Sequence, residues 1–452
     1  MTLDRRRLLA VSALTGAVPA ASWVTPVSAA PSSAFGVDAT QLGVRAGGGA
    51  DQSAMLQAAI DRAAGARMPL LLGPGDYRVS GLKLPSGGQI VGVRGATRLL
   101  LAANKPLLAA FGAEQITLSN VVFDGGSRPL PEHTALLQFA KCSGVRIVDC
   151  DIVNSGYTAL RLEAVEGSIA GNTIAKSADV AIYSLDARGL TIANNTVRGA
   201  GNGGILVHRS RQEDDGTLVL DNRIEDIANV AGGSGQFGNA INVFRAGNVI
   251  VRGNRISRAA FSAVRGNAAS NIQITGNTAT DIGEVAIYSE FGFQGAVIAN
   301  NTMDGAALGV CVVNFNEGGR LATVQGNMIR NLKPKRPAGT DPNDGAGIGI
   351  AVEADTSVTG NVIEDAPYAG IAIGWGAYMR DVAVTGNVVR NTKFGVTVSV
   401  ASGAGTAVIA GNLISGATKG AIVGMEFTKP VTDLDREPTR YANLQVSGNR
   451  VR

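Results

Sequence analysis

Four side chains that can transfer protons or stabilise charge stand at outward positions of one repeated segment: Arg265, Tyr288, Glu290 and His208. An arginine can neutralise the carboxylate of a uronate sugar, and a tyrosine activated by that arginine can remove a ring proton. This is the chemistry of elimination, and returning the proton to the other face of the ring turns it into epimerisation. We therefore expect a polysaccharide lyase or epimerase with these four residues as its catalytic groups.

The spacing of these residues limits which of them can act together. Arg265 and Tyr288 occupy the same position of adjacent repeats, as do Asn267 and Glu290. His208 precedes Tyr288 by three repeats, which corresponds to roughly 14 Å in a stack of strands. We expect Arg265, Tyr288 and Glu290 to cooperate directly, and His208 to act with them only through the substrate or a loop.

Further polar side chains on the same repeats are expected to bind the substrate. Later repeats carry small residues at the equivalent positions, so the polar residues are concentrated on the middle repeats. This concentration predicts a groove along one sheet for a polysaccharide or oligosaccharide. The expected substrate-binding residues are Asn242, Arg245, Asn267, Arg209, Tyr183, Asp186 and Asn314.

Two other functions stay open. Hydrolysis needs two carboxylates, about 5 Å or about 6.5–9.5 Å apart. Glu290 has no carboxylate on adjacent repeats in its columns, and Glu163 and Asp186 lie towards one end. Elimination or epimerisation is therefore favoured over a glycoside hydrolase. A non-catalytic polysaccharide-binding protein, or a structural protein of the cell envelope, fits the same residues because a fold does not imply a function.

The segments that carry these residues recur along the chain. A Gly-Asn-x-aliphatic phrase is repeated from Asp151 onward, and its key asparagines lie 23 to 37 residues apart. A period of about 20–50 residues indicates a solenoid or a propeller. The asparagines are Asn172, Asn195, Asn222, Asn254, Asn277, Asn301, Asn327, Asn361, Asn387, Asn412 and Asn449.

Six-residue segments such as Ala181–Asp186 and Ala286–Phe291 lie between the asparagines, with aliphatic or small residues at positions two and four. This period of two is typical of a strand with one face turned inward. No helical period separates the strands, so each strand is expected to pair with its equivalent one coil later. We expect an all-β parallel β-helix of about 11 coils. Asparagine suits the left-handed turns, and its stacked amides can form a ladder.

The pattern resembles the right-handed parallel β-helix of the pectin-lyase-like superfamily from about Leu107 to Arg452. With its N-terminus and segments such as Gly345–Ile350, the chain also resembles a functionally uncharacterised bacterial family of twin-arginine-translocated repeat proteins. The second resemblance implies a β-helix and export. The first suggests carbohydrate chemistry by analogy only.

The N-terminal part is expected to cover the first coil. Residues 36–106 are interpreted as this cap and the first coils, and residues 107–452 as the β-helix repeats. Asp51-Gln52-Ser53 can begin a helix that runs to about Ala64, as solenoids need a cap at their ends. Its apolar face would consist of Met55, Leu56, Ala59, Ile60 and Ala63.

The C-terminal end is expected to be covered differently. Asn443–Val451 resembles one more coil, and no capping helix follows it. Because an open sheet edge invites pairing, we expect the segment Thr428–Arg440 or a second copy of the chain to cover this coil. A homo-oligomer through the C-terminal coil is the second of these alternatives.

Three insertions are candidates for the walls of the groove. Ile227–Asn239 and Asn331–Ala346 both precede the strand that carries the polar residues, so they leave the solenoid from the same corner. Ser210–Gly216 leaves from the opposite corner, beside His208. Long loops on a rigid scaffold often form binding sites.

Residues 1–29 are interpreted as an export signal of the twin-arginine type. Arg5-Arg6-Arg7 precedes Leu8-Leu9 and a short apolar run, and Val27-Ser28-Ala29 offers a cleavage site. The export machinery is then a partner of the chain. We expect a periplasmic or secreted protein that is exported folded and has no permanent membrane anchor.

Composition narrows the partners further. The net charge of +4 includes the arginines of the signal, and no basic run with aromatic residues is present, so nucleic-acid binding is not expected. Cys142, Cys150 and Cys311 are interpreted as small apolar residues. No metal constellation stands out and no cofactor is expected; calcium at Asp341–Asp344 is the one alternative.

Overall fold

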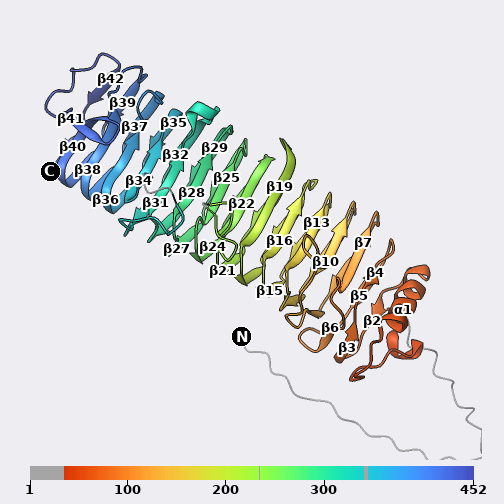
Figure 1. Ribbon diagram of the computed structural model, residues 1–452. Coiled ribbons are helices and arrows are strands. Elements are labelled where there is room, and N and C mark those ends of the chain that lie inside the picture. Colours follow the sequence, from red (N-terminus) through yellow and green to blue (C-terminus); the bar gives the residue numbers. More distant parts are fainter. Residues whose placement is uncertain (1–34, 234, 341–344) are drawn as a thin grey trace, which may run out of the picture. The chain divides into compact units, whose positions relative to one another are not determined.

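The computed structural model describes residues 35–233, 235–340 and 345–452. The segment 1–29 interpreted as an export signal, and the proposed calcium loop Asp341–Asp344, lie outside these residues. Phe35–Arg452 form one compact unit, which contains both the N-terminal cap and the repeats. The unit is a β-solenoid of about 14 turns with one short helix (Figure 1). The expected all-β parallel β-helix is confirmed, and the expected number of about 11 coils is too low.

Each complete coil of the solenoid has a strand, or part of a longer strand, on each of three faces. The first face is a 16-stranded parallel sheet. Its strands are β1 (Val37–Asp38), β2 (Leu70–Leu71), β5 (Gln89–Val91), β8 (Thr117–Ser119), β11 (Val145–Val148), β14 (Gly167–Ala170), β17 (Thr191–Ala193), β20 (Leu218–Leu220), β23 (Ile250–Arg252), β26 (Ile272–Thr275), β29 (Gln294–Ala299), β32 (Arg320–Gln325), β35 (Ala354–Thr359), β37 (Arg380–Thr385), β39 (Ala407–Ala410) and β42 (Leu444–Ser447).

The second face follows the turn that contains the repeated asparagine. Its strands are β3 (Gly75–Val79), β6 (Thr97–Leu101), β9 (Val122–Asp124), β12 (Asp151–Val153), β15 (Thr173–Ser177), β18 (Thr196–Ala200), β21 (Arg223–Ile227), β24 (Arg255–Ala259), β27 (Thr278–Thr280), β30 (Thr302–Asp304), β33 (Met328–Arg330), the first parts of β36 (Val362–Ile373), β38 (Val388–Ser399) and β40 (Leu413–Glu426), and β43 (Arg450–Val451).

The third face carries the polar columns identified in the sequence. Its strands are β4 (Leu82–Lys83), β7 (Leu108–Phe111), β10 (Ala135–Ala140), β13 (Thr158–Glu163), β16 (Val180–Leu185), β19 (Gly203–Asp214), β22 (Asn239–Gly247), β25 (Val264–Asn267), β28 (Val285–Glu290), β31 (Leu308–Val312), β34 (Ile348–Val352) and the second parts of β36, β38 and β40.

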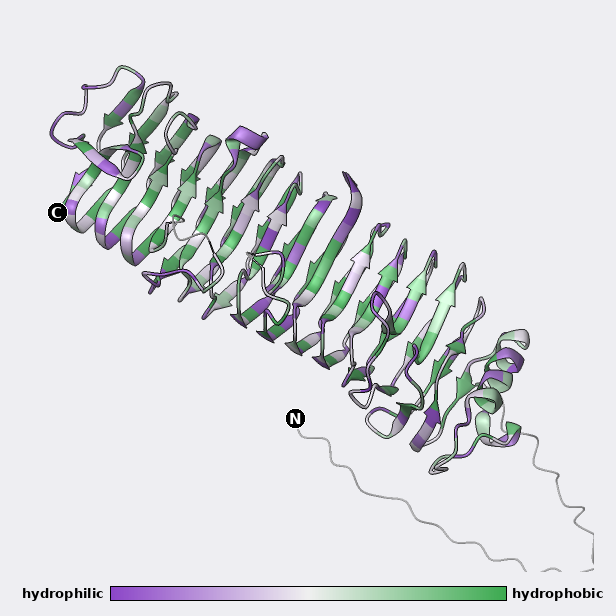
Figure 2. Cartoon of the chain, viewed as in Figure 1, coloured by the Kyte–Doolittle hydropathy of each residue, from purple (hydrophilic) through white to green (hydrophobic). Residues whose placement is uncertain are grey.

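On the coils that carry the polar residues, the register of the third face is the one that the sequence pattern predicted. Ile182 of β16 pairs with Ile205 of β19, and Tyr183 pairs with Leu206. The aliphatic residue at position two points inward and is fully buried, so successive coils stack isoleucine and valine in the core. Burying one such side chain stabilises the fold by about 1.5–3 kcal/mol. Figure 2 shows apolar residues along the strands and polar residues gathered at loops and at the end of β19.

The asparagine ladder is present. Asn172 donates from Nδ2 to Oδ1 of Asn195 at 2.9 Å, and Asn195 donates likewise to Asn222 at 3.0 Å. The same bond continues to Asn412 and Asn449. The left-handed conformation belongs to the residue before each ladder asparagine, such as Gly171 (φ 70°), rather than to the asparagine itself. Each asparagine therefore serves hydrogen bonding, and the preceding Gly, Asn or Asp makes the turn.

The coil count from the sequence was too low because the first coils lack the ladder asparagine. The ladder ends where Asn172 Oδ1 accepts a hydrogen bond from the backbone N–H of Cys150, at 2.9 Å. Cys150 occupies the ladder position of its coil, and burial raises the pKa of its thiol to about 12. All three cysteines are buried and free, as expected for small apolar residues.

A helix covers the N-terminal end of the solenoid. Helix α1 (Ser53–Gly65) buries Leu56, Ala59, Ile60 and Ala63 against the first coils. Met55, expected on the same face, is 45% exposed, because the apolar stripe is narrower than the sequence suggested. A short 3-10 helix, η1 (Ala39–Leu42), precedes α1.

At the C-terminal end, β41 (Lys429–Asp433) lies in the segment expected to cover the last coil. It pairs antiparallel with the second part of β40, so it covers the edge of the third face. It does not cover the last coil itself, whose strands have no further partner strand among the described residues and are largely exposed. The last coil is formed by β42 and β43, as the resemblance of Asn443–Val451 to a coil predicted.

Candidate functional site

A pocket of about 770 Å³ lies on the third face, across the neighbouring strands β13, β16, β19, β22 and β25. Five of the residues expected to act on or bind substrate line it: Tyr183, His208, Asn242, Arg265 and Asn267. Further lining residues, not selected from the sequence, are His133, Tyr157, Thr158, Arg161, Asp179, Asn202, Leu206, Gln236, Phe237 and Phe244. The pocket is thus centred two to three coils before Tyr288.

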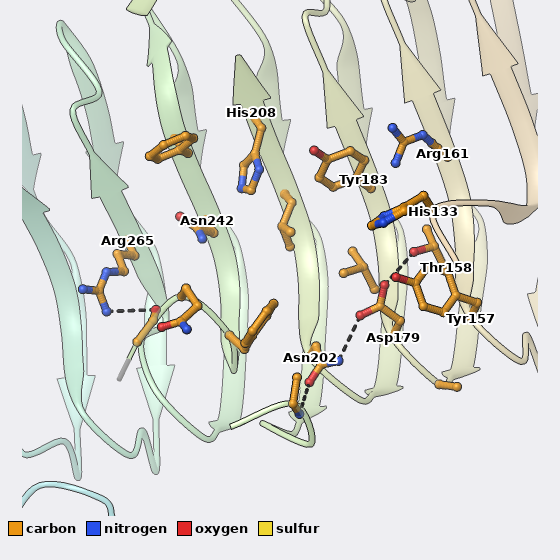
Figure 3. A pocket seen from close by; sticks show the side chains of 18 of the residues that line it. His133, Tyr157, Thr158, Arg161, Asp179, Tyr183, Asn202, His208, Asn242 and Arg265 are labelled. Carbon is orange, nitrogen blue, oxygen red and sulfur yellow. Dashed lines mark hydrogen bonds between the residues drawn. The ribbon is translucent and has the colours of Figure 1, made fainter. Parts of the chain in front are cut away.

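A continuous row of side chains in contact, with its aromatic rings edge to face, crosses the floor of the pocket and ends at the rim. The Arg161 guanidinium lies 4.9 Å from the centre of the Tyr183 ring, and that ring lies 5.3 Å from the His208 ring. His208 in turn lies 5.5 Å from Phe244, and the Arg245 guanidinium lies 4.7 Å from the same phenyl ring. Figure 3 shows Arg161, Tyr183 and His208 side by side on successive strands. The row therefore runs from coil to coil, with an arginine at each end.

The imidazole of His208 is held neutral. Burial between two aromatic rings lowers the pKa of His208 to about 4, because the charged form would lose its hydration. Its Nε2 atom is covered and has no hydrogen-bond partner among the described residues. The imidazole must therefore rotate before Nε2 can reach a ligand.

Asn242, on the next strand, also has a buried polar atom without a hydrogen-bond partner among the described residues. The side chain is 7% exposed, and its Oδ1 has no hydrogen-bond partner within the described part of the chain. A buried carbonyl oxygen without a donor costs about 1–3 kcal/mol. A ligand hydroxyl that reached this oxygen would recover that free energy, which is the behaviour of a binding group.

The corner between the second and third faces supplies the polar wall of the pocket. Asp179 accepts hydrogen bonds from the Thr158 hydroxyl and from Asn202 Nδ2, each at 2.9 Å. Asn202 Oδ1 accepts a bond from the backbone N–H of Ala231 at 2.8 Å, which ties the loop between β21 and β22 to this corner (Figure 3). Thr158, Asp179 and Asn202 stand one or two positions before the six-residue segments of the repeat, so extending those segments would have found them.

Both histidines of the chain line this one pocket. His208 rises from β19, whereas His133 belongs to the loop between β9 and β10 and is exposed. Thr134 bonds back to the Pro131 carbonyl through its hydroxyl at 2.6 Å, which fixes the end of that loop. No repeating pattern includes His133, so only the rarity of histidine in the sequence pointed to it.

Arg265 is not a free cation for substrate. Its Nε and Nη2 atoms donate to the two carboxylate oxygens of Glu290 at 2.6 and 3.0 Å. Its Nη1 atom donates to the Gly235 carbonyl at 3.0 Å and lies 3.5 Å from Glu284. Asn267 also donates to Glu290, at 2.9 Å. Arg265 and Asn267 therefore line the end of the pocket while they compensate a buried carboxylate.

Tyr288 is placed differently from the activated base that the sequence suggested. It packs in an apolar cluster with Val285, Leu308, Cys311 and Ile348, outside the pocket lining. Burial raises the pKa of Tyr288 above its ordinary value, although the Arg265 guanidinium lies 5.0 Å from the ring. The expected lowering of this pKa by the arginine is wrong, because the loss of hydration outweighs the attraction.

Four expected binding residues lie at the rim and bond to the chain itself. Arg209 donates to Glu213 at 2.9 Å, and Asp186 accepts from the Ser210 backbone N–H at 2.8 Å. Arg245 Nη1 donates to the Ser210 carbonyl at 3.2 Å. Asn314, which precedes the 3-10 helix η2 (Phe315–Glu317), accepts from the Phe291 backbone N–H at 3.2 Å.

Two of the three insertions are loops that leave the solenoid where the sequence predicted, and the third is mostly a strand. Loop 228–238 leaves before β22 and lines the pocket through Ala231, Gly235, Gln236 and Phe237, while loop 331–346 leaves before β34. The segment Ser210–Gly216, expected as a loop, mostly continues β19 and pairs with β22 after a register shift between His208 and Glu213. A strand continues there because Ala246 and Gly247 extend β22 alongside it.

Neither a metal centre nor a membrane helix is found in the described ranges. No group of three His, Cys, Asp or Glu side chains there could hold a metal ion. None of the helices described is long and apolar enough to cross a membrane.

Comparison with known proteins assigns the family. The model described as "Right handed beta helix region" matches residues 109–236, 166–327 and 233–379, which together extend over more than half of the chain. The chain therefore belongs to the right-handed β-helix family. No curated protein matches the sequence.

Solved structures share this fold at low identity. Pre-mature gene product 12 of bacteriophage phi29 is 15% identical with a TM-score of 0.53; the match covers 92% of this chain and 57% of that protein. PfbA, a surface adhesin of Streptococcus pneumoniae, is 16% identical with a TM-score of 0.50, over 88% and 94% of the two chains. The mannuronan C-5 epimerase AlgE6 A-module of Azotobacter vinelandii is 15% identical with a TM-score of 0.44, over 92% and 99%. These likenesses concern the fold alone.

Proposed function

We propose that the protein binds an extended, uronate-containing polysaccharide along the third face, and that lyase or epimerase chemistry acts on a uronate there. The observation that supports this most is the row Arg161–Tyr183–His208–Phe244–Arg245. Its three aromatic rings follow one another on successive coils, and an arginine stands at each end. The pocket also holds uncompensated polar atoms among apolar rings, which is typical of ligand sites.

The direction of the row favours a long ligand. Neighbouring strands lie about 4.8 Å apart, so the five strands β13 to β25 place about 19 Å of groove along the solenoid. Aromatic faces pack against the apolar faces of sugar rings, and arginines pair with carboxylates. Arg161 is only loosely paired, at 3.6 Å from Glu163, so its guanidinium can turn to a uronate.

In the catalytic version, His208 replaces Tyr288 as the base. The neutral imidazole takes the proton from the ring carbon next to the carboxylate, and the C–H electrons form a double bond to the carboxylate carbon while the charge moves onto the carboxylate oxygens. In the lyase, the glycosidic oxygen on the next ring carbon then leaves with its bonding electrons and takes a proton from the imidazolium or from water, which gives an unsaturated uronate. In the epimerase, water instead protonates the ring carbon on its other face, which gives the epimer. Asn242 stands on the next strand, where its amide can bond to the carboxylate.

Binding without catalysis is the second candidate, and one observation favours it. Nε2 of His208 is covered by its neighbours, and Tyr288 has a raised pKa, so neither base is poised without a ligand. Hydrolysis is favoured less than either. Asp179 is the one carboxylate among the described residues that line the pocket, and both its oxygens accept hydrogen bonds.

The test measures binding and chemistry on the same polymers. The protein is incubated with alginate, pectate and a neutral polysaccharide, and dissociation constants, ultraviolet absorbance and deuterium uptake from heavy water are recorded. We expect binding to the acidic polymers that Tyr183→Ala weakens about tenfold, which is about 1.4 kcal/mol. Tyr378→Ala, at a half-exposed tyrosine outside the pocket, is the matched control.

Each result separates the versions of the proposal. Rising absorbance indicates a lyase, deuterium uptake without absorbance indicates an epimerase, and binding with neither indicates a binding protein. A wild-type protein that binds no acidic polymer contradicts the proposed function altogether.

A further inference from the structure

Four buried charges of alternating sign join the floor of the third face to two loops. In order they are Glu290, Arg265, Glu284 and Arg336, and their side chains are 3%, 12%, 3% and 8% exposed. Arg336 Nη1 donates to Glu284 Oε1 at 2.8 Å, and Arg265 Nη1 lies 3.5 Å from Glu284 Oε2. Glu284 therefore stands in the middle of the chain of charges, with an arginine on each carboxylate oxygen.

One side of this network fixes loop 228–238, the wall of the pocket. The Gly235 carbonyl accepts hydrogen bonds from Arg265 Nη1 at 3.0 Å and from Asn239 Nδ2 at 2.8 Å. Gln236 and Phe237, the next residues, line the pocket. The position of the wall thus depends on where the Arg265 guanidinium is held.

The other side fixes the loop that precedes β34, described here over 331–340. Arg336 reaches from this loop to Glu284, and its Nε donates to the Gly345 carbonyl at 2.8 Å. The two loops also touch, since a Cβ atom added at Gly339 would lie 3.2 Å from the Gly233 carbonyl oxygen. Glu284 therefore holds both loops, although it lines no part of the pocket itself.

Opposing effects act on the charge of Glu284. Burial raises the pKa of the Glu284 carboxyl above its ordinary value despite Arg265 and Arg336, and the nearby Glu290 adds to this. Protonation is therefore easier in the folded protein than in the unfolded chain, and it leaves two buried arginines with less counter-charge.

We propose that Glu284 is a positioning residue that holds both loops against the third face only while its carboxylate is charged, so that acidification loosens the wall of the groove. The groups that face it are Arg265 on β25, Glu290 on β28, Arg336 on the second loop and the Ser262 hydroxyl at 3.5 Å. Protonation removes the charge that both arginines share. It leaves the asparagine ladder and the core untouched.

The first measurement needs no ligand. Amide hydrogen exchange of the two loops is followed at pH 7.5 and pH 5, after correction for intrinsic rates, in the wild type, Glu284→Gln and Glu225→Gln. Glu225 also pairs with arginines, but on the second face, so its variant is the matched control. We expect loop exchange about tenfold faster in Glu284→Gln at pH 7.5, no further change at pH 5, and a wild type that approaches the variant at pH 5.

Exchange in the core and a second variant keep the test decisive. Amide exchange along the asparagine ladder should be the same in Glu284→Gln as in the wild type, and Arg336→Met should loosen the loops as Glu284→Gln does, whereas Arg336→Lys should loosen them less. Wild-type loop exchange in both Glu284→Gln and Arg336→Met contradicts the proposal. Equally accelerated exchange along the ladder in Glu284→Gln also contradicts it, because the charge would then serve the whole fold rather than the two loops.

The second measurement rests on the proposed function. On an acidic polymer that the wild type binds, Glu284→Gln should bind about tenfold more weakly at pH 7.5. Unchanged affinity in a variant with loosened loops would contradict the link between the loops and the groove. If the wild type binds no polymer while the exchange results hold, the proposed function fails and the positioning role of Glu284 stands.

Discussion

The guanidinium of Arg265 donates two parallel hydrogen bonds, 2.6 and 3.0 Å long, to the carboxylate of Glu290. The repeat pattern places both side chains at outward positions of the third face, yet Glu290 is only 2% exposed. A bidentate pair of this kind is geometrically specific, and removing one buried partner leaves an uncompensated charge. The pair that suggested a catalytic centre therefore also supports the end of the pocket.

Glu290→Gln should reduce the free energy of unfolding by about 3–5 kcal/mol, because the buried Arg265 loses its main counter-charge. Denaturant unfolding measures this change. Glu163→Gln is the control: Glu163 is 43% exposed and 3.6 Å from Arg161, so its loss should cost no more than about 1 kcal/mol. Equal stability of the two variants would show that the buried pair contributes no more than the exposed one.

Asn277→Ala should be among the most destabilising changes in the solenoid. Asn277 donates to Asn301 Oδ1 and to the Val251 carbonyl, both at 3.0 Å, and accepts from the backbone and side-chain nitrogens of Asn254. Each buried group left without a partner costs about 1–3 kcal/mol, so a loss of at least about 3 kcal/mol is expected.

The control for the ladder is its last member. Asn449→Ala removes a donor and an acceptor at the end of the solenoid, where the side chain bonds to Ile409 and Asn412 only. Urea unfolding should show a clearly smaller loss for this variant. A loss as small for Asn277→Ala as for Asn449→Ala would mean that water replaces the ladder bonds.

The repeat predicted where strands lie and which residues share a column. Arg265 pairs with Tyr288, and Asn267 with Glu290, as their positions in the segments required. The repeat did not predict how deeply these side chains are buried. Tyr288 is covered by apolar side chains, and Glu290 by Arg265 and Asn267. Loops add to this burial, and a loop conformation depends on single contacts such as that between Arg336 and Glu284. His133 reached the pocket through such a loop and so had no periodic signal.

Stability should depend on the protonation of His208. Its pKa falls from 6.5 to about 4 in the folded protein, so the unfolded chain binds more protons between these values. The contribution of His208 to stability is therefore fully present above about pH 6.5 and is lost as pH falls towards 4, by up to about 3 kcal/mol.

His208→Phe isolates this contribution, because phenylalanine fits the aromatic row and does not titrate. The difference in free energy of unfolding between wild type and variant, measured from pH 7.5 to pH 4, should change with pH in favour of the variant at low pH. Taking the difference cancels the opposite slope expected from Glu284, whose raised pKa favours the folded state at low pH. A difference that stays constant across this range would mean that the imidazole titrates alike in both states.

Asn242→Leu should separate stability from binding. The Oδ1 atom of Asn242 is buried without a hydrogen-bond partner among the described residues, so an apolar side chain of similar size removes an uncompensated group, and the free energy of unfolding should be unchanged or slightly raised. Affinity for the acidic polymer should fall about tenfold, because the ligand loses that oxygen. Thr397→Val is the control, since Thr397 occupies an outward position of the third face on β38, beyond the pocket lining. Calorimetric Tm values and dissociation constants check both parts. Weaker folding with unchanged affinity would make Asn242 a structural residue and would move the centre of the site towards Arg161 and Tyr183.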